Sequence, residues 1–132
     1  PAADGWLGEV VPKILASPAY KHGGLLVITA DEAPSSGEFA DSSSCCGQPA
    51  QFPNMPAPSA AAAALGPAGG GQVGALLLSP YVKGGVISQA QYDHFSLLRT
   101  IEDLFELKHL GYTDAAKAKS LEPSLFLAKP AG

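Results

Sequence analysis

Hydrophobic side chains are concentrated in two short runs of this chain, and each run is bounded by turn residues. The first covers residues 25–28, after Gly23 and Gly24, and the second covers residues 73–79, before Pro80. Short apolar runs between glycine and proline are typical of strands buried on both faces, as they are inside a parallel sheet. We therefore predict two strands and expect them to run parallel.

Two further segments carry apolar residues at helical spacing. Their positions are Trp6, Leu7, Val10, Val11, Ile14 and Leu15 in the first segment, and Phe95, Leu98, Ile101, Leu104 and Phe105 in the second. Asp4 and Asp93 stand where N-caps are expected, and Pro12 predicts a kink or a helix start close to it. Together with the two strands, these helices predict an α/β fold.

The second helix has a polar face opposite its apolar stripe, which is the usual pattern when the stripe faces a core. Its polar residues are Arg99, Glu102, Asp103 and Glu106. Because Arg99 and Asp103 are four residues apart, we expect them to form an ion pair on the helix surface.

Residues 33–72 differ from the rest of the chain, because proline, glycine, serine and alanine dominate them. A segment of this length without regular structure is uncommon in a compact domain unless it is functional or disordered. It directly follows Asp31 and Glu32, so one interpretation is a lid or rim over a site. The other is a flexible excursion at the surface.

The composition bounds the chain to one domain and excludes two classes of partner. The whole chain, residues 1–132, is no longer than a single domain. Its formal net charge is −4 and its lysines and arginines do not cluster, which argues against nucleic acid and anionic membranes as partners. No apolar run approaches the roughly 20 residues that span a bilayer, so we expect no transmembrane segment.

The two cysteines, Cys45 and Cys46, are neighbours in a loop rich in serine, glycine and proline. Adjacent thiols without a nearby histidine make a poor zinc site. A bond between them would be strained, because neighbouring Cα atoms lie only about 3.8 Å apart. We expect at least one of them to pair with a cysteine outside this chain, and two free buried thiols are the alternative.

Two adjacent carboxylates, Asp31 and Glu32, follow the first predicted strand, just before Pro34 turns the chain into the loop. In open α/β sheets, functional sites lie beyond the carboxyl ends of the strands. Adjacent carboxylates repel each other unless a positive group holds them, and a divalent metal ion is the usual partner. The alternative is that both are solvated residues at an ordinary strand end.

His94 stands in the first turn of the second helix, one strand later in the chain. It could converge with Asp31 and Glu32 on one metal centre. Carboxylate and imidazole ligands suit Zn²⁺, Mn²⁺ or Fe better than Ca²⁺. The alternative is that His94 only makes a local hydrogen bond at the start of its helix.

Several segments together resemble the bacterial phosphoesterase family, which includes phospholipase C-type enzymes and acid phosphatases. They are residues 11–18 (VPKILASP), 26–33 (LVITADEA), 73–82 (VGALLLSPYV) and 92–105 (YDHFSLLRTIEDLF), with Trp6 and Leu7 before them. Through this family the chain is similar to the alkaline phosphatase superfamily. The resemblance implies part of a large sandwich with a mostly parallel sheet covered by helices, and a metal site at the carboxyl ends of the strands.

The resemblance also implies roles for a few residues. Asp31 and Glu32 match a metal-binding pair, with Glu32 standing where many relatives carry histidine. His94 matches a late histidine that binds a second metal or the phosphoryl group. Tyr92 and Asp93 would then be the residues that orient His94.

One departure from the family shapes the functional prediction. The family's hydroxyl nucleophile and first metal ligands lie in an amino-terminal half that nothing in this chain matches. We therefore expect the carboxyl-terminal portion of a metal-dependent phosphoric-ester hydrolase, bound to the amino-terminal portion of the same enzyme. Its substrate would be a phosphomonoester, a phosphoinositide or another phospholipid, and its location would be secreted or in a bacterial cell envelope. The alternative is a non-catalytic binding or structural chain with a degenerate metal site.

Overall fold

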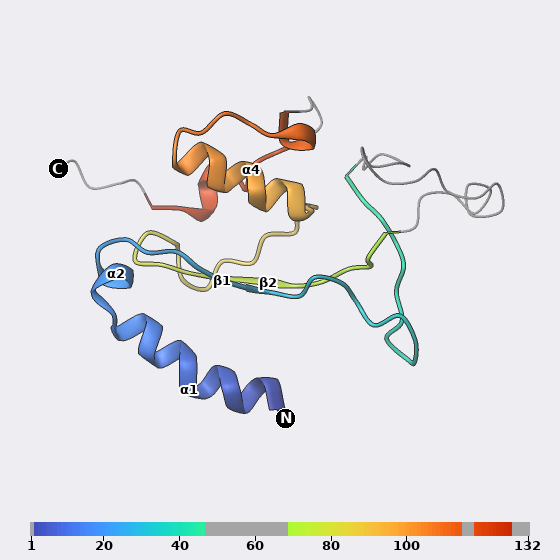
Figure 1. Cartoon of the computed structure of the whole chain (residues 1–132), viewed down its shortest axis with the longest axis horizontal. Helices are drawn as coiled ribbons and strands as arrows, with labels where there is room; N and C mark the ends of the chain where they lie inside the picture. Colours follow the sequence, from blue (N-terminus) through green and yellow to red (C-terminus); the bar gives the residue numbers. More distant parts are fainter. Residues whose placement is uncertain (1, 47–68, 115–117, 128–132) are drawn as a thin grey trace. The chain divides into compact units, whose positions relative to one another are not determined.

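The computed structural model describes residues 2–46, 69–114 and 118–127 of the chain. In chain order its elements are α1 (Ala2–Ala16), α2 (Pro18–Lys21), β1 (Leu26–Thr29), β2 (Ala75–Leu78), α4 (His94–Leu104) and the 3₁₀ helices η1 (Gly111–Asp114) and η2 (Pro123–Leu125) (Figure 1). Most of the predicted loop at 33–72 lies outside the described residues. The chain divides into two compact units.

The first unit combines Pro1–Thr29, Ala75–Val86 and Ser124–Gly132. Its two strands confirm the predicted α/β class, but β1 and β2 pair antiparallel, with Leu26 opposite Leu78 and Thr29 opposite Ala75. This corrects the prediction of a parallel pair, and the described residues contain no parallel sheet. An unbroken apolar run indicates burial on both faces, but it carries no information about the direction of the neighbouring strand.

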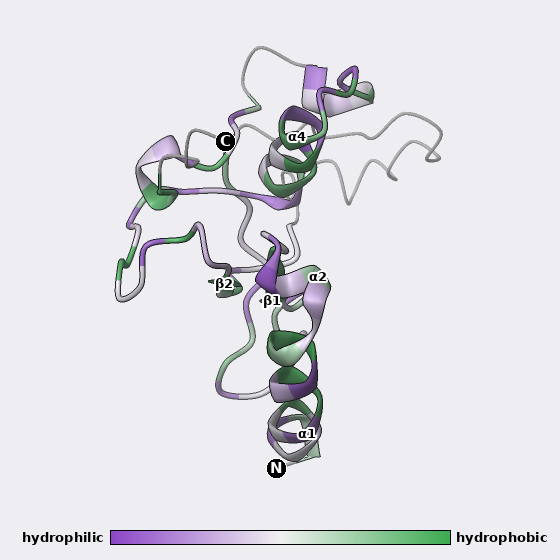
Figure 2. Ribbon diagram, turned by 90° about the vertical axis from the view of Figure 1, so that its left-hand side faces the viewer, coloured by the Kyte–Doolittle hydropathy of each residue, from purple (hydrophilic) through white to green (hydrophobic). Residues whose placement is uncertain are grey.

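Helix α1 begins at Ala2, so Asp4 lies in its first turn instead of capping it. A carboxylate is favourable there because it faces the positive end of the helix dipole. Pro12 lies inside the continuous helix. Figure 2 shows hydrophobic residues at several places along α1, and the side chain of Trp6 is 62% exposed.

A hollow of about 410 Å³ lies between α1 and β1. Its lining is almost entirely apolar and includes Trp6, Leu7, Val10, Val11, Ile14 and Leu26–Thr29. None of the hydrophobic residues in the described parts of the chain is buried. The first unit therefore leaves a large part of its apolar surface in contact with water.

The turn into β1 requires glycine at position 23. Gly23 has a φ of +108°, and a Cβ atom there would lie 2.6 Å from the ring of Tyr81. The segment around Tyr81 also pairs with the end of the described chain, because Val82 forms an antiparallel bridge with Phe126. The glycine thus lets the chain pass close to the segment that follows β2.

The second unit combines Ala30–Gly74 and Ile87–Pro123, and it is organised around α4. Asp93 caps this helix through a capping box, in which its side chain accepts from the Ser96 backbone N–H and the Ser96 hydroxyl accepts from the Asp93 backbone N–H. The N-cap predicted at Asp93 is therefore confirmed. The helix starts at His94, which places the imidazole in the first turn as expected.

Helix α4 buries part of its polar face. Glu102 is only 2% exposed, and its carboxylate accepts a hydrogen bond from the Leu110 backbone N–H at 3.1 Å and one from the Thr113 hydroxyl at 2.5 Å. These bonds satisfy the buried carboxylate and hold the turn after the helix. The apolar stripe is exposed over most of its length, with Leu104 at 57% and Phe105 at 72%.

The ion pair predicted between Arg99 and Asp103 is replaced by other contacts. Arg99 donates to the Thr113 carbonyl oxygen. Asp103 lies 2.7 Å from His109 Nε2 and accepts a hydrogen bond from the Ser120 hydroxyl. The segment after α4 folds back over the polar face, so side chains that helical spacing pairs with each other find partners on that segment.

No described helix combines the length and the apolar character that a membrane span requires.

Candidate functional site

Three short segments of the second unit are connected by backbone hydrogen bonds: residues 31–34, 41–44 and 69–72. We call these three segments the loop platform. Four backbone hydrogen bonds connect them: Ala33 N–H to Gly70 O (2.7 Å), Asp41 N–H to Pro34 O (3.1 Å), Gly69 N–H to Ser42 O (3.0 Å) and Gly71 N–H to Ser43 O (3.0 Å). The platform carries Asp31 and Glu32, so these bonds fix the backbone next to the candidate carboxylates.

Close backbone approach explains the glycines of the platform. Gly71 has a φ of +77°, and a Cβ atom there would lie 2.6 Å from the Ala33 side chain. A Cβ atom at Gly70 would lie 3.2 Å from Cβ of Glu32. Residues with side chains at these positions would push the platform segments apart.

Asp41 holds two of the platform segments together. One carboxylate oxygen accepts from the Ser43 backbone N–H and the other accepts from the Gln72 backbone N–H, each at 2.8 Å. These hydrogen bonds, with the one to Gln72 largest, lower the pKa of Asp41 below its usual value of 3.8. Asp41 was not predicted from the sequence, although an aspartate followed two residues later by Ser43 is typical of an Asx turn.

We predict that the clamp formed by Asp41 weakens only as the pH falls below 3.8. Its pKa is lower in the folded protein than in the unfolded chain, so its stabilising contribution is complete above pH 3.8 and is lost as the pH falls through the lower folded value. Carboxyl-carbon NMR should place the titration of Asp41 below 3.8, and exchange of the Gln72 amide should speed up over the same range. In the variant Asp41→Asn this acid-dependent change should vanish. A midpoint at or above 3.8 would show that the clamp does not form.

A pocket of about 210 Å³ opens within the platform. It is lined by Glu32, Ala33, Ser35, Ala40, Asp41, Ser42, Gly69 and Gly70. Glu32 and Asp41 both line this pocket, and two acidic residues without a basic one make its surroundings favour cations over anions.

The structure brings Asp31 and His94 together, although 63 residues separate them. His94 Nε2 lies 2.8 Å from the backbone carbonyl oxygen of Asp31. A carbonyl oxygen can only accept, so Nε2 carries the proton, and in the neutral ring the lone pair is on Nδ1. The Asp31 carboxylate accepts from the Glu32 backbone N–H at 3.0 Å, and its side chain is exposed.

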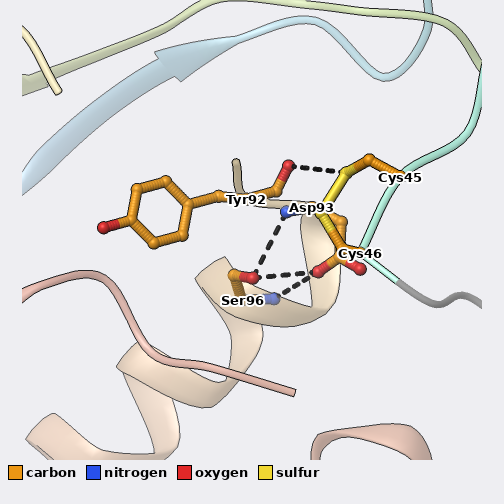
Figure 3. Close-up of a disulfide and its surroundings, with 5 residues drawn as sticks. All are labelled: Cys45, Cys46, Tyr92, Asp93 and Ser96. Atoms are coloured by element: carbon orange, nitrogen blue, oxygen red, sulfur yellow. Dashed lines mark hydrogen bonds between the residues drawn. A yellow bond between two sulfur atoms is a disulfide. The ribbon is translucent and has the colours of Figure 1, made fainter. Parts of the chain in front are cut away.

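Tyr92 and Asp93 lie directly before His94, and each has its own contacts. The carboxylate of Asp93 is used by Ser96 in the helix cap (Figure 3), and the Tyr92 hydroxyl accepts from the Glu122 backbone N–H at 3.1 Å. Both residues therefore fix the start of the helix that carries the imidazole. Their predicted role in orienting His94 stays a prediction.

The predicted metal ligands do not form a closed site within the described residues, where no group of three or more histidine, cysteine, aspartate or glutamate side chains is gathered closely enough to hold a metal ion. Their chemistry nevertheless suits the metals that were expected, because exposed carboxylates and an imidazole nitrogen are ligands for Zn²⁺, Mn²⁺ and Fe. A complete coordination sphere would need ligands beyond these three.

Cys45 and Cys46 form a disulfide with each other. This corrects the expectation that one of them pairs with a cysteine outside the chain, and it excludes the alternative of two free thiols. The backbone accommodates the bond through Cys46, which has a φ of +66°, a left-handed conformation that is uncommon for a residue other than glycine. Sequence spacing alone did not indicate that the chain adopts this conformation.

Comparison with protein families identifies the class to which the chain belongs. The model of the Phosphoesterase family matches residues 1–108, which include Asp31, Glu32 and His94. The chain therefore belongs to the Phosphoesterase family, and this membership indicates phosphoester hydrolysis at a coarse level. Searches of curated proteins and of solved structures gave no match.

Proposed function

We propose that the chain is the carboxyl-terminal portion of the catalytic domain of a metal-dependent phosphoric-ester hydrolase, of phosphatase or phospholipase C-like type. The observation that carries this proposal is the contact between His94 and Asp31, next to Glu32, in a chain of the Phosphoesterase family. Family membership supplies the reaction class. The contact joins residues of two distant segments that were singled out from the sequence.

In this proposal Asp31 and Glu32 hold a divalent metal ion through their carboxylates, and His94 contacts a second metal or the phosphoryl group. A bound metal would stabilise negative charge on the phosphoryl oxygens. Because the Asp31 carbonyl oxygen accepts from His94 Nε2, the imidazole would act through Nδ1. The Asp31 residue would then serve twice, with its backbone orienting His94 and its carboxylate binding metal.

The nucleophile, a serine or threonine hydroxyl, would come from an amino-terminal portion of the same enzyme. The exposed apolar surface supports such a partner. The stripe of α4 is exposed at Leu98, Ile101 and Leu104, and the hollow between α1 and β1 is lined by apolar side chains. Amphipathic helices normally bury such stripes against a neighbouring layer.

The substrate class in this proposal is a phosphate ester, with small phosphomonoesters, phosphoinositides and other phospholipids as the candidates. We place the enzyme outside the cytoplasm, either secreted or in a bacterial cell envelope. The Cys45–Cys46 disulfide supports this location, because disulfides persist mainly in oxidising compartments.

Removal of the metal tests the proposed function. In the complete enzyme, dialysis against a strong chelator should abolish hydrolysis of an aryl phosphate, and Zn²⁺, Mn²⁺ or Fe²⁺ should restore it while Ca²⁺ should not. The melting temperature should fall and recover in parallel, because a ligand that binds only the folded state stabilises it. Full activity in the metal-depleted enzyme would refute the metal-dependent mechanism.

The second candidate function is a non-catalytic binding or structural role with a degenerate metal site. It rests on the family resemblance, which places Glu32 where many relatives carry histidine. This candidate predicts that no transition metal co-purifies and that added Zn²⁺ or Mn²⁺ leaves the melting temperature unchanged. The same experiment therefore separates the two functions.

A further inference from the structure

The disulfide between Cys45 and Cys46 directly follows segment 41–44 of the loop platform and lies against the start of α4 (Figure 3). Sγ of Cys45 is 3.5 Å from the backbone carbonyl oxygen of Tyr92. Tyr92 directly precedes Asp93, the N-cap of the helix that carries His94. The disulfide thus contacts the backbone at Tyr92, two residues before His94 of the candidate site.

This disulfide contributes little to the stability of the fold as a whole. Cross-links stabilise proteins mainly by closing long loops in the unfolded chain, and no residue lies between Cys45 and Cys46. The Cα atoms of the pair are 3.8 Å apart, closer than the 4.4–6.8 Å of ordinary disulfides. Cys46 also occupies the left-handed region, with φ of +66°. Stabilisation of the fold therefore does not explain why this bond is present.

Two contacts join the platform and the residue that directly follows its segment 41–44 to the start of α4 in the second unit. One links the Asp31 carbonyl oxygen to His94 Nε2, and the other links Cys45 Sγ to the Tyr92 carbonyl oxygen. Cys45 directly follows the platform segment 41–44, and that segment is connected to residues 31–34 by the hydrogen bond from the Asp41 N–H to the Pro34 carbonyl oxygen. A change at the disulfide can therefore reach the contact between Asp31 and His94 along the backbone and through this hydrogen bond.

We propose that Cys45 and Cys46 form a reversible dithiol/disulfide site whose redox state sets the geometry of the His94–Asp31 contact. A small-molecule or protein dithiol reduces the bond: the S–S bond breaks, Cys45 and Cys46 each gain a hydrogen, and the reductant becomes a cyclic disulfide. The consequence for catalysis, but not the redox chemistry itself, rests on the proposed function.

Reduction changes both features that hold the pair in place. A disulfide sulfur has no proton to donate, so the oxidised contact with Tyr92 is a close sulfur–oxygen approach. A thiol at Cys45 can donate to the same carbonyl oxygen. Without the bond, Cys46 is also released to leave its left-handed conformation, which is unfavourable for a residue with a Cβ atom. We expect the loop end and the start of α4 to become more mobile.

The test uses the complete enzyme in buffers of oxidised and reduced dithiothreitol. Alkylation followed by peptide mass spectrometry should show Cys45 and Cys46 converting together, and reversibly, between the disulfide and two alkylated thiols. Hydrogen exchange in a peptide covering residues 92–97 should be about fivefold faster in the reduced form. Exchange in residues 100–104 of the same helix should not change, which provides the internal control.

Aryl phosphate turnover adds a second measurement. We expect kcat/KM to differ about fivefold between the two redox states. The double variant Cys45→Ser/Cys46→Ser should have the value of the reduced enzyme and should not respond to the reductant.

Each outcome decides the proposal. A pair that resists reduction in the folded enzyme, or that is reduced without any change in exchange at residues 92–97, overturns it. Faster exchange throughout the enzyme would identify a structural cross-link and would also overturn it. If neither redox state hydrolyses any phosphate ester, the proposed function fails, and the thiol and exchange measurements still decide whether this switch exists.

Discussion

Produced without an amino-terminal portion of the enzyme, the 132-residue chain should not fold cooperatively and should hydrolyse no phosphate ester. The reason is that none of its described hydrophobic residues is buried, so their apolar surface stays in contact with water. Burial of apolar area is the main favourable term in folding, at roughly 25 cal/mol per Å², and conformational entropy opposes folding with a free energy of similar size. The measurement is thermal unfolding of the purified chain, combined with sedimentation.

The isolated chain should show a broad transition without a sharp midpoint, and it should associate into larger species. A single sharp transition in a stable monomer would contradict the prediction.

Two variants of the complete enzyme test whether the exposed apolar stripe is covered by the amino-terminal portion. Leu104→Glu places a charge in the exposed stripe of α4. It should strongly destabilise the folded enzyme if the amino-terminal portion covers that stripe. Lys108→Gln, at an exposed position just beyond the helix, should have little effect.

The local structure of this chain could be predicted from its sequence where short-range chemistry determines it. The spacing of Phe95, Leu98 and Ile101 indicated a helix, and Asp93 with Ser96 supplied its N-terminal cap as expected. The short apolar runs became strands β1 and β2. Each of these features depends on residues within a few positions of one another.

Features that depend on distant residues could not be predicted in the same way. Strand direction was wrong because an apolar run is compatible with both kinds of pairing. The buried position of Glu102 was not foreseen, because it requires the segment at Leu110–Thr113 to fold back over the helix. A helical pattern identifies the polar face but does not show what packs against it.

The same difference between local features and features that depend on distant residues applies to the candidate site. Asp31, Glu32 and His94 could be singled out from their residue types and their places at a strand end and a helix start. The contact with His94 uses the backbone carbonyl of Asp31, and no pattern of side chains predicts a backbone contact across 63 residues. The clamp formed by Asp41 was missed because its second partner, Gln72, lies beyond the long loop.

The substitution Asp31→Asn should reduce kcat/KM for an aryl phosphate about 10³-fold in the complete enzyme. Asparagine has the same size, keeps the backbone carbonyl that contacts His94, and keeps a side-chain oxygen to accept from the Glu32 N–H. Only the negative charge is lost. A metal ion supplies several kcal/mol of transition-state stabilisation, and each 1.4 kcal/mol is about tenfold in rate, so removal of a charged ligand should have this large effect.

The control is Glu38→Gln, which makes the same exchange of carboxylate for amide at an exposed position of the same loop and should leave turnover unchanged. Metal content should be measured in the same samples.

The comparison of Asp31→Asn with the parent enzyme decides whether Asp31 binds a metal that is needed for hydrolysis. We expect a folded variant with the parent's melting profile in the metal-free state, less bound metal and about 10³-fold lower kcat/KM. A folded variant that keeps the parent's metal content and turnover would contradict it and would remove Asp31 from the site.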